Sequence, residues 1–236
     1  MKNRILILSI LLISFGTILT SCECPSEIDT PKEIVPKDFA NVTIINALPE
    51  FQDISVMNNV NYVLPNLNYF SNFINTSKFI AGYSNISIKN SIDSTTIYNS
   101  FFNFDKDSNY TMVIYGKSNR NYSLLIKDKA LNNSLNKAFI RFIHASLDAP
   151  KNVKFVLSQN FNLEFLINAK SNSEYFETEP TTYDLKILNS VNDSILINYG
   201  NIKLESQNAY TLLLKGYQST NDTKKLMCQV IKKKLL

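Results

Sequence analysis

The feature that most constrains the fold of this chain is an internal duplication with a period of about 100 residues. The segment Ala138–Val156 contains a strand pattern, a turn and a second strand pattern, and Ala40–Val56 repeats this arrangement more weakly. Further along, Asn109–Gly116 matches Ala209–Gly216, and the offset between the copies stays between 98 and 100 residues. Such a small drift favours duplication of one fold unit over chance similarity.

Each copy has short strand patterns with alternating apolar and polar residues and frequent turn signals between them. A parallel α/β sheet requires helical patterns between its strands, and the one helix-like stretch, Leu67–Ile74, is equally well explained as a loop with aromatic residues. The sequence therefore predicts an all-β protein with two tandem immunoglobulin-like or antiparallel β-sandwiches, over residues 38–130 and 137–236. Between the matched ends, Gly82-Tyr83 is aligned with Thr182-Tyr183, with one extra residue in the first copy.

Residues 1–21 have the pattern of a lipoprotein signal peptide. A short basic start precedes an apolar run from Ile5 to Leu19, which at roughly 15 residues is shorter than the ~20 that a spanning helix needs. The run ends in Leu19-Thr20-Ser21-Cys22, which resembles the lipobox of bacterial lipoproteins. This resemblance implies that Cys22 carries the lipid, and that the bilayer is a partner of the mature protein.

Residues 22–37 contain three prolines and no apolar periodicity, which predicts an extended tether. We therefore expect the protein in the bacterial cell envelope, anchored to the outer membrane on its periplasmic or exposed face. Cys24 in the tether and Cys228 near the other end could pair in an oxidising compartment, but sequence alone does not show whether they meet.

Composition and motifs argue against several function classes. The formal net charge is +4, and two of the basic residues leave with the signal, so nothing indicates a nucleic-acid partner. No zinc-type cysteine pair or nucleophile motif is present, and we expect no metal, no cofactor and no enzymatic activity. Asp105–Asn109 begins with calcium-loop spacing, but Tyr110 stands where such a loop needs glycine, which favours a hairpin turn.

His144 is the single histidine, and it precedes a turn that contains Asp148 and Pro150. Such a histidine can act as a general base or a metal ligand, or it can bond the backbone of the turn. We favour the structural role, because the first copy has Asn46 at this position and asparagine makes similar hydrogen bonds without titrating.

Tyr110 and Tyr210 each follow a polar turn and begin an apolar strand. This placement is similar to the tyrosine corner of immunoglobulin-like sandwiches, in which the hydroxyl bonds upstream backbone; an ordinary core tyrosine is the alternative. Tyr69, Phe70 and Phe73 lie among asparagines and serines. If exposed, these rings could stack on a sugar or a protein partner, and if buried they cover one end of a sandwich.

The run Phe142–Pro150, followed by Val153–Val156, resembles the opening motif of the bacterial envelope family called domain of unknown function 4397. The strands Tyr183–Ile187 and Ala209–Thr211 resemble its later blocks, so the resemblance is clearest in the second copy and fainter in the first. It implies an extracytoplasmic β-sandwich, often in tandem and often on lipoproteins, and it implies no known activity.

These features together predict a membrane-anchored envelope lipoprotein with a non-enzymatic role in binding, adhesion or scaffolding. A carbohydrate-binding surface lipoprotein is the alternative, and an envelope hydrolase is a more distant one. Asp93-Ser94-Thr95 and Asp193-Ser194-Ile195 also resemble an O-glycosylation motif of envelope proteins. Neither the ligand nor the oligomeric state follows from the sequence.

Overall fold

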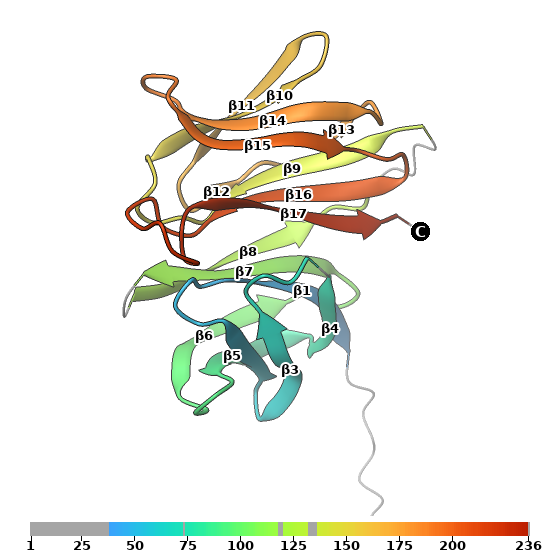
Figure 1. Cartoon of the computed structure of the whole chain (residues 1–236). Helices are drawn as coiled ribbons and strands as arrows, with labels where there is room; N and C mark the ends of the chain where they lie inside the picture. The colour runs from blue at the N-terminus through green and yellow to red at the C-terminus, as the bar shows by residue number, and fades with distance from the viewer. Residues whose placement is uncertain (1–37, 73, 118–119, 132–135, 236) are drawn as a thin grey trace, which may run out of the picture. The chain divides into compact units, whose positions relative to one another are not determined.

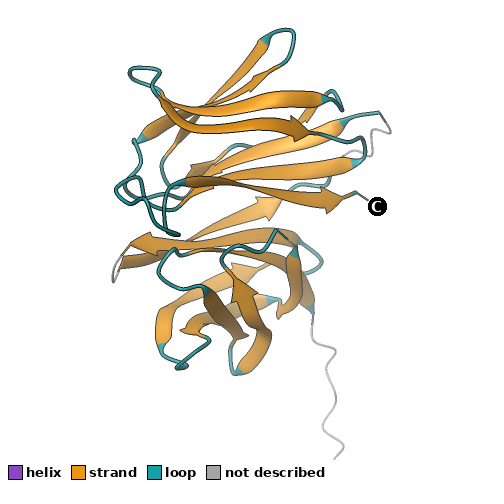
Figure 2. Cartoon of the chain, in the orientation of Figure 1, coloured by secondary structure: helices purple, strands orange, loops and turns teal. Residues whose placement is uncertain are grey.

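The structure is a computed structural model that describes residues 38–72, 74–117, 120–131 and 136–235. Every regular element in these residues is a β-strand, and none is a helix (Figure 2). The all-β sandwich class is therefore confirmed. No helix in the described residues has the length and apolar character needed to cross a membrane. The signal peptide, the tether with Cys22 and Cys24, and Phe73 lie outside the described residues.

The first sandwich consists of two four-stranded sheets, in the orders β4-β1-β7-β8 and β3-β2-β5-β6 (Figure 1). Strands β1 and β7 run parallel, and the other pairs are antiparallel. Its apolar core includes Val42, Ile54, Ile88 and Met112. The strands are β1 (Phe39–Ala47), β2 (Asp53–Asn58), β3 (Asn61–Asn68), β4 (Asn75–Ile80), β5 (Gly82–Asn90), β6 (Thr96–Phe104), β7 (Asn109–Lys117) and β8 (Arg120–Asp128).

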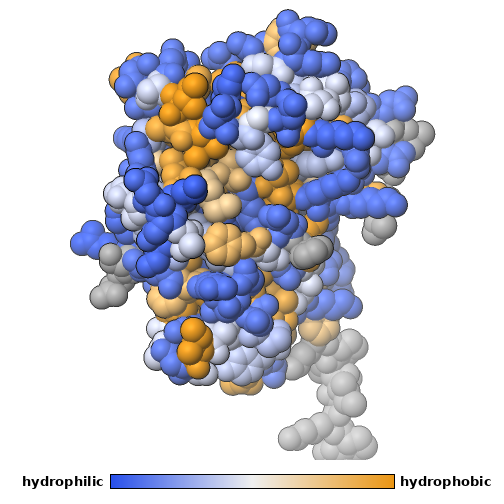
Figure 3. Space-filling model, in the orientation of Figure 1, coloured by the Kyte–Doolittle hydropathy of each residue, from blue (hydrophilic) through white to orange (hydrophobic). Residues whose placement is uncertain are grey.

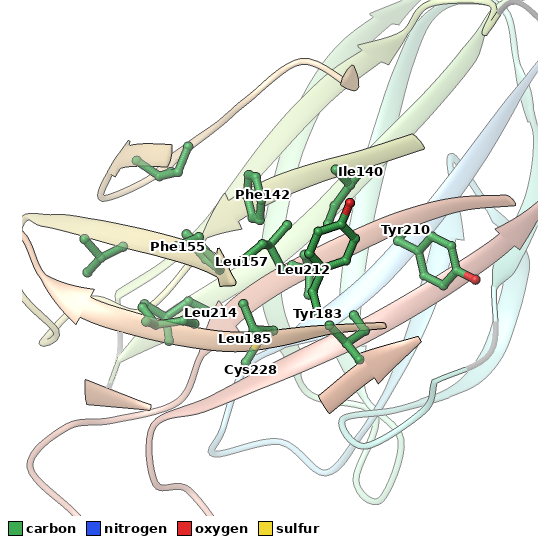
Figure 4. Close-up of a cluster of buried hydrophobic side chains, with 14 of the residues drawn as sticks. Ile140, Phe142, Phe155, Leu157, Tyr183, Leu185, Tyr210, Leu212, Leu214 and Cys228 are labelled. Atoms are coloured by element: carbon green, nitrogen blue, oxygen red, sulfur yellow. The ribbon is translucent and has the colours of Figure 1, made fainter. Parts of the chain in front are cut away.

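The second sandwich has the same strand order, except that its fourth strand is split into two short pieces that both pair with β9. Its sheets are β11-β10-β14-β15 and β12-β9-β16-β17. Figure 4 shows its core, where Phe142, Phe155 and Leu212 pack between the sheets. The strands are β9 (Ala138–His144), β10 (Asn152–Ser158), β11 (Asn162–Asn168), β12 (Ser171–Asn172), β13 (Phe176–Thr178), β14 (Thr182–Asn189), β15 (Ile195–Lys203), β16 (Asn208–Lys215) and β17 (Met227–Lys234).

The strand order differs from that of constant-type immunoglobulin domains. In those domains the first two strands are neighbours in one sheet. Here β1 pairs with β4 and in parallel with β7, while β2 lies in the opposite sheet. Alternation along a strand shows which residues face inward, but it does not show which strands pair.

Strand pairing also corrects the sequence alignment of the copies. Ile88 of β5 and Ile187 of β14 pair with equivalent residues of β2 and β10, as the sequence match expects. Further back along the same strands, however, Tyr83 is equivalent to Thr182 and not to Tyr183. Tyr183 faces the core, whereas Tyr83 faces solvent. The one-residue shift in the alignment moves Tyr83 from the core face to the solvent face of the sheet, because successive side chains of a strand point to opposite sides.

The two sandwiches also share buried surface within the compact unit formed by Lys37–Leu236. Every residue of β9 and β16 is buried, so these strands are covered on both faces. A third apolar cluster explains this, because Ile45 and Val113 of the first sandwich pack with Ile143 and Leu213 of the second. Residues that a lone sandwich would expose to solvent form this inter-sandwich core.

A buried polar network lies beside this cluster. The Arg141 guanidinium on β9 donates to the Asp128 carboxylate at 2.7 Å and to the Thr111 hydroxyl at 2.7 Å, both in the first sandwich. It also donates to the Thr211 hydroxyl of its own sandwich at 2.9 Å, and it lies 4.4 Å from the centre of the Tyr175 ring. Arg141 therefore ties the two sandwiches together through a paired and hydrogen-bonded buried charge.

Candidate functional site

The outer face of the sheet β3-β2-β5-β6 carries several exposed aromatic side chains. Tyr83 on β5 is 75% exposed, and Phe101 on the neighbouring strand β6 is 55% exposed. Their rings are nearly parallel, at 4°, with centres 5.1 Å apart. Aromatic rings are usually buried in a core or an interface, so an exposed stacked pair is a candidate contact site.

Polar side chains surround this pair. On β5 the outward-facing positions after Tyr83 are Asn85, Ser87 and Lys89, because the alternate residues of that strand belong to the core. The outward-facing positions of β6 around Phe101 are Asn99 and Asn103. Strands β5 and β6 are described in full, and neither presents a carboxylate on this face.

A third aromatic residue lies farther along the same face. Tyr62 on β3 is 55% exposed and sits opposite Met57 of β2, which in turn pairs with Ser87. The Lys89 ammonium lies 5.9 Å from the centre of the Tyr62 ring. We call the surface formed by Tyr62, Tyr83 and Phe101 with the polar residues between them the aromatic face.

The second sandwich has no such surface at the equivalent positions. Strand registers place Glu164, Thr182 and Asn201 where the first copy has Tyr62, Tyr83 and Phe101. The outer face there carries ion pairs instead, such as Lys186 with Asp184 at 2.9 Å. Figure 3 shows polar and apolar side chains interspersed on the visible side of the molecule. The aromatic face is thus specific to one copy.

The aromatic face was not predicted from the sequence. The match between the two copies paired Tyr83 with the core residue Tyr183, so this match did not indicate that Tyr83 faces solvent. Strict alternation from Ile88 and Ile86 back along β5 would place Ser84 inside and Tyr83 outside. That local signal was available, whereas the stacking with Phe101 depends on the pairing of β5 with β6.

Tyr69 and Phe70, which were candidates for a ligand platform, differ in their exposure to solvent. Tyr69 is only 2% exposed, and its ring centre lies 3.7 Å from the Lys215 ammonium of the second sandwich. Phe70 is 46% exposed and packs edge-on against Tyr69 with ring centres 4.9 Å apart. Tyr69 therefore cannot stack on a ligand here, because it covers the junction between the sandwiches; Phe73 lies outside the described residues.

His144 and Asn46 both bond the backbone of the turn that follows them. The His144 side chain is fully buried, and its Nε2 donates to the Pro150 carbonyl at 2.9 Å. Asn46 Nδ2 donates to the Phe51 carbonyl at 2.9 Å, and its Oδ1 accepts from the Leu48 backbone at 3.0 Å. Burial lowers the pKa of His144, so its neutral form is favoured at this position.

Asp148 connects its turn to two other segments. Its carboxylate accepts from the Lys117 ammonium at 2.8 Å, from the Ser219 hydroxyl at 2.7 Å and from the Gln218 backbone at 2.9 Å. Burial alone would raise the pKa of Asp148, but the hydrogen bonds from Lys117 and from residues 218 and 219 hold it at about 2. Asp148 is thus a charged and fully hydrogen-bonded carboxylate, which holds its turn to Lys117 and to residues 218 and 219.

The two corner tyrosines make equivalent contacts. The Tyr110 hydroxyl accepts a hydrogen bond from the Asp105 backbone at 3.0 Å, and the Tyr210 hydroxyl accepts one from the Glu205 backbone at 2.9 Å. Each bond reaches five residues upstream and fixes the turn before β7 or β16. A tyrosine-corner contact therefore occurs here in a sandwich with a different strand order.

Other features offer less chemistry. A cavity of about 220 Å³ beside Arg141 and Tyr175 is lined by the Asp128 carboxylate, which Arg141 already binds. Cys228 is buried in the second core, where burial raises the pKa of its thiol to about 12. In the described part of the chain, no group of three or more His, Cys, Asp or Glu residues could hold a metal ion.

Comparison with known protein families gives a match to part of the chain. Residues 40–154 match the family model described as Domain of unknown function (DUF4397). No curated protein matches the chain. The matched segment covers the first sandwich and continues through β9 into β10, rather than the second copy where we expected the clearest resemblance. This match supports a relationship between residues 40–154 and the DUF4397 family.

Proposed function

We propose that this chain is a lipid-anchored protein of the bacterial cell envelope whose two sandwiches form a non-enzymatic binding module. In this proposal the aromatic face is the contact surface, and the second sandwich is a second copy of the same domain that supports the first. The observation that carries the proposal is the exposed Tyr83–Phe101 pair, present on one copy only.

The divergence between equivalent positions supports a binding role. Both copies keep apolar residues at their inward positions, because each must close its own core. At three outward positions the second copy has Glu164, Thr182 and Asn201, which solvent accommodates readily. The aromatic residues of the first copy leave apolar ring surface in water, which a bound partner would cover.

The anchor rests on the lipobox-like sequence before Cys22. A diacylglyceryl group together with a further acyl chain provides stable attachment, which a single chain does not. We expect the wild-type protein to partition into the detergent phase, and a Cys22→Ser variant to remain in the aqueous phase. Equal partitioning of the two proteins would contradict lipidation at Cys22.

Binding through the aromatic face is tested with the mature chain carrying Cys22→Ser, so that the lipid does not contribute. The test variant combines Tyr83→Thr and Phe101→Asn, the residues that the second sandwich tolerates at these positions. The matched control combines Thr182→Ala and Asn201→Ala. We expect labelled protein to bind isolated bacterial envelopes, the test variant to lose binding and the control to retain it. Equal binding by all three would refute the proposed contact surface.

A further inference from the structure

We infer that the aromatic face binds an uncharged glycan of more than one sugar ring. This inference rests on the proposed binding role and adds the chemical class of the ligand. It is drawn from the geometry of the exposed rings, the side chains around them and the charge of the face.

The ring pair is suited to a flat, weakly apolar partner. Tyr83 and Phe101 cover each other on one side only, and both remain more than half exposed. Each therefore presents ring surface to solvent. A sugar ring has a flat face of C–H groups that can lie against an aromatic ring, while its hydroxyls point outward from the rim.

The polar residues of the face match those hydroxyls. Asn99 and Asn103 lie on the same face of β6 as Phe101, and Ser87 lies on the same face of β5 as Tyr83. Amide and hydroxyl side chains both donate and accept hydrogen bonds, as sugar hydroxyls do. Aromatic rings combined with a few polar groups of this kind are typical of sites that fix a ligand's orientation.

The charge of the face points to an uncharged ligand. Lys89 is the one cation among the outward positions of β5, and it already lies near the Tyr62 ring. A polyanion would require several cations, and a cationic ligand would require carboxylates, which β5 and β6 do not present on this face. The outer face of the second sandwich, with its Lys154–Glu164 and Lys186–Asp184 pairs, provides the contrast.

The position of Tyr62 sets the size of the ligand. Tyr62 and Ser87 both pair with the same residue of β2, so they lie two strand spacings apart. Ser87 lies four residues beyond Tyr83 on β5. Strand geometry then separates Tyr62 from Tyr83 by roughly 16 Å. A ligand that contacts both must be longer than a single sugar ring, so we expect an oligosaccharide or polysaccharide.

The first test is affinity electrophoresis of the mature Cys22→Ser chain in gels that contain a neutral β-glucan, mannan or xylan. We expect at least one of these polysaccharides to retard the protein. Tyr83→Thr with Phe101→Asn should weaken that affinity about tenfold or more, and Tyr62→Glu should weaken it for long chains more than for short ones. The Thr182→Ala and Asn201→Ala control should behave as the parent chain. Circular dichroism and melting temperature establish that each variant is folded.

The second test distinguishes this inference from the broader proposal. Envelopes are treated with periodate, which cleaves sugars, or with a protease, and binding of the labelled protein is measured. Loss after periodate and retention after protease support the glycan. If binding needs Tyr83 and Phe101 but is lost only after protease, the partner is a protein; the glycan inference is then wrong and the binding role stands. Binding that added salt abolishes would overturn the uncharged class.

Discussion

Lys215 is a fully buried lysine that joins the two sandwiches. Its ammonium group donates to the backbone carbonyls of Tyr69 and Asn46, the latter at 3.3 Å, and lies over the Tyr69 ring. The equivalent residue of the first copy is Tyr115, so the charge belongs to one copy only. Burial lowers the pKa of Lys215 to about 7, because the charged form loses hydration that the carbonyls only partly replace.

The Lys215→Met variant should remove a pH dependence of stability. Above pH 7 the folded protein releases the Lys215 proton while the unfolded chain keeps it up to about pH 10.4, so the unfolded state binds more protons. The free energy of unfolding should therefore rise between pH 7 and 9, by up to about 1.4 kcal/mol per pH unit. Lys215→Met should lack this rise in urea titrations.

Cys228 also affects stability in this range, because an unfolded cysteine ionises at about pH 8.5 while the folded thiol does not. This contribution is the same in wild type and Lys215→Met, so it cancels in their comparison. Burial raises the pKa of the Tyr69 hydroxyl and of the Cys228 thiol, so both stay protonated in the folded protein below pH 9. The matched control is Lys186→Met, on the solvent-facing side of β14. An identical stability profile for wild type and Lys215→Met would show that Lys215 does not titrate in this range.

His144 should produce a separate effect in acid. Burial lowers its pKa below the usual value of 6.5, so the unfolded chain takes up a proton before the folded protein does. Stability should fall as the pH drops below about 6.5. The His144→Asn variant, which copies Asn46, should lose this His-dependent part while keeping a bond to the turn. Unchanged acid sensitivity in calorimetry at several pH values would contradict this prediction.

At the scale of elements, the connection between β16 and β17 depends on a close backbone approach. Gly216 has a φ of +89°, and a Cβ atom there would lie 2.2 Å from the Lys225 carbonyl oxygen. Both conditions favour glycine. Other residues are strained at this φ, and the Lys225 backbone cannot move away from a Cβ atom without a large loss of stability. The connection places Gln218 and Ser219 where they donate to Asp148.

A pair of glycine variants separates the two conditions. Gly200 has a similar φ of +82°, but a Cβ there meets nothing within 4 Å. Gly200→Ala should therefore cost about 1–2 kcal/mol of stability from backbone strain alone, and Gly216→Ala should cost clearly more because of the added clash. Urea denaturation measures both, and equal costs would mean that the connection relaxes to accept the methyl group.

At the scale of the whole molecule, the polar network around Arg141 connects the sandwiches. Arg141→Met should lower the free energy of unfolding by about 3–5 kcal/mol, because it leaves the Asp128 carboxylate buried without its partner. Adding Asp128→Leu should recover part of this loss. The matched control is Lys106→Met at the exposed pair with Asp38, where little or no loss of stability is expected because solvent screens the pair. Equal effects in denaturant titrations would contradict a buried pair.

The extent of the prediction from sequence differs between features. Alternating apolar residues and the repeated turn chemistry by themselves determined the all-β class and most strand positions, because both are local properties of the chain. The hydrogen bonds that His144 and Asn46 make to their turns are of the same kind, since each partner lies within six residues. The alignment of one copy with the other depends on residues about 100 positions apart, and it misplaced Tyr83 by one residue.

The tertiary structure alone decided the rest. Arg141, Ile143 and Leu213 occupy positions that alternation assigns to the outside, yet they are buried because the sheets of the two copies pack together there. The same contact covers Tyr69 with Lys215, while Tyr83 and Phe101 stay exposed on the sheet that faces away from it. Which outward face of a strand is buried depends on what packs against it, and residues distant in the sequence supply that partner.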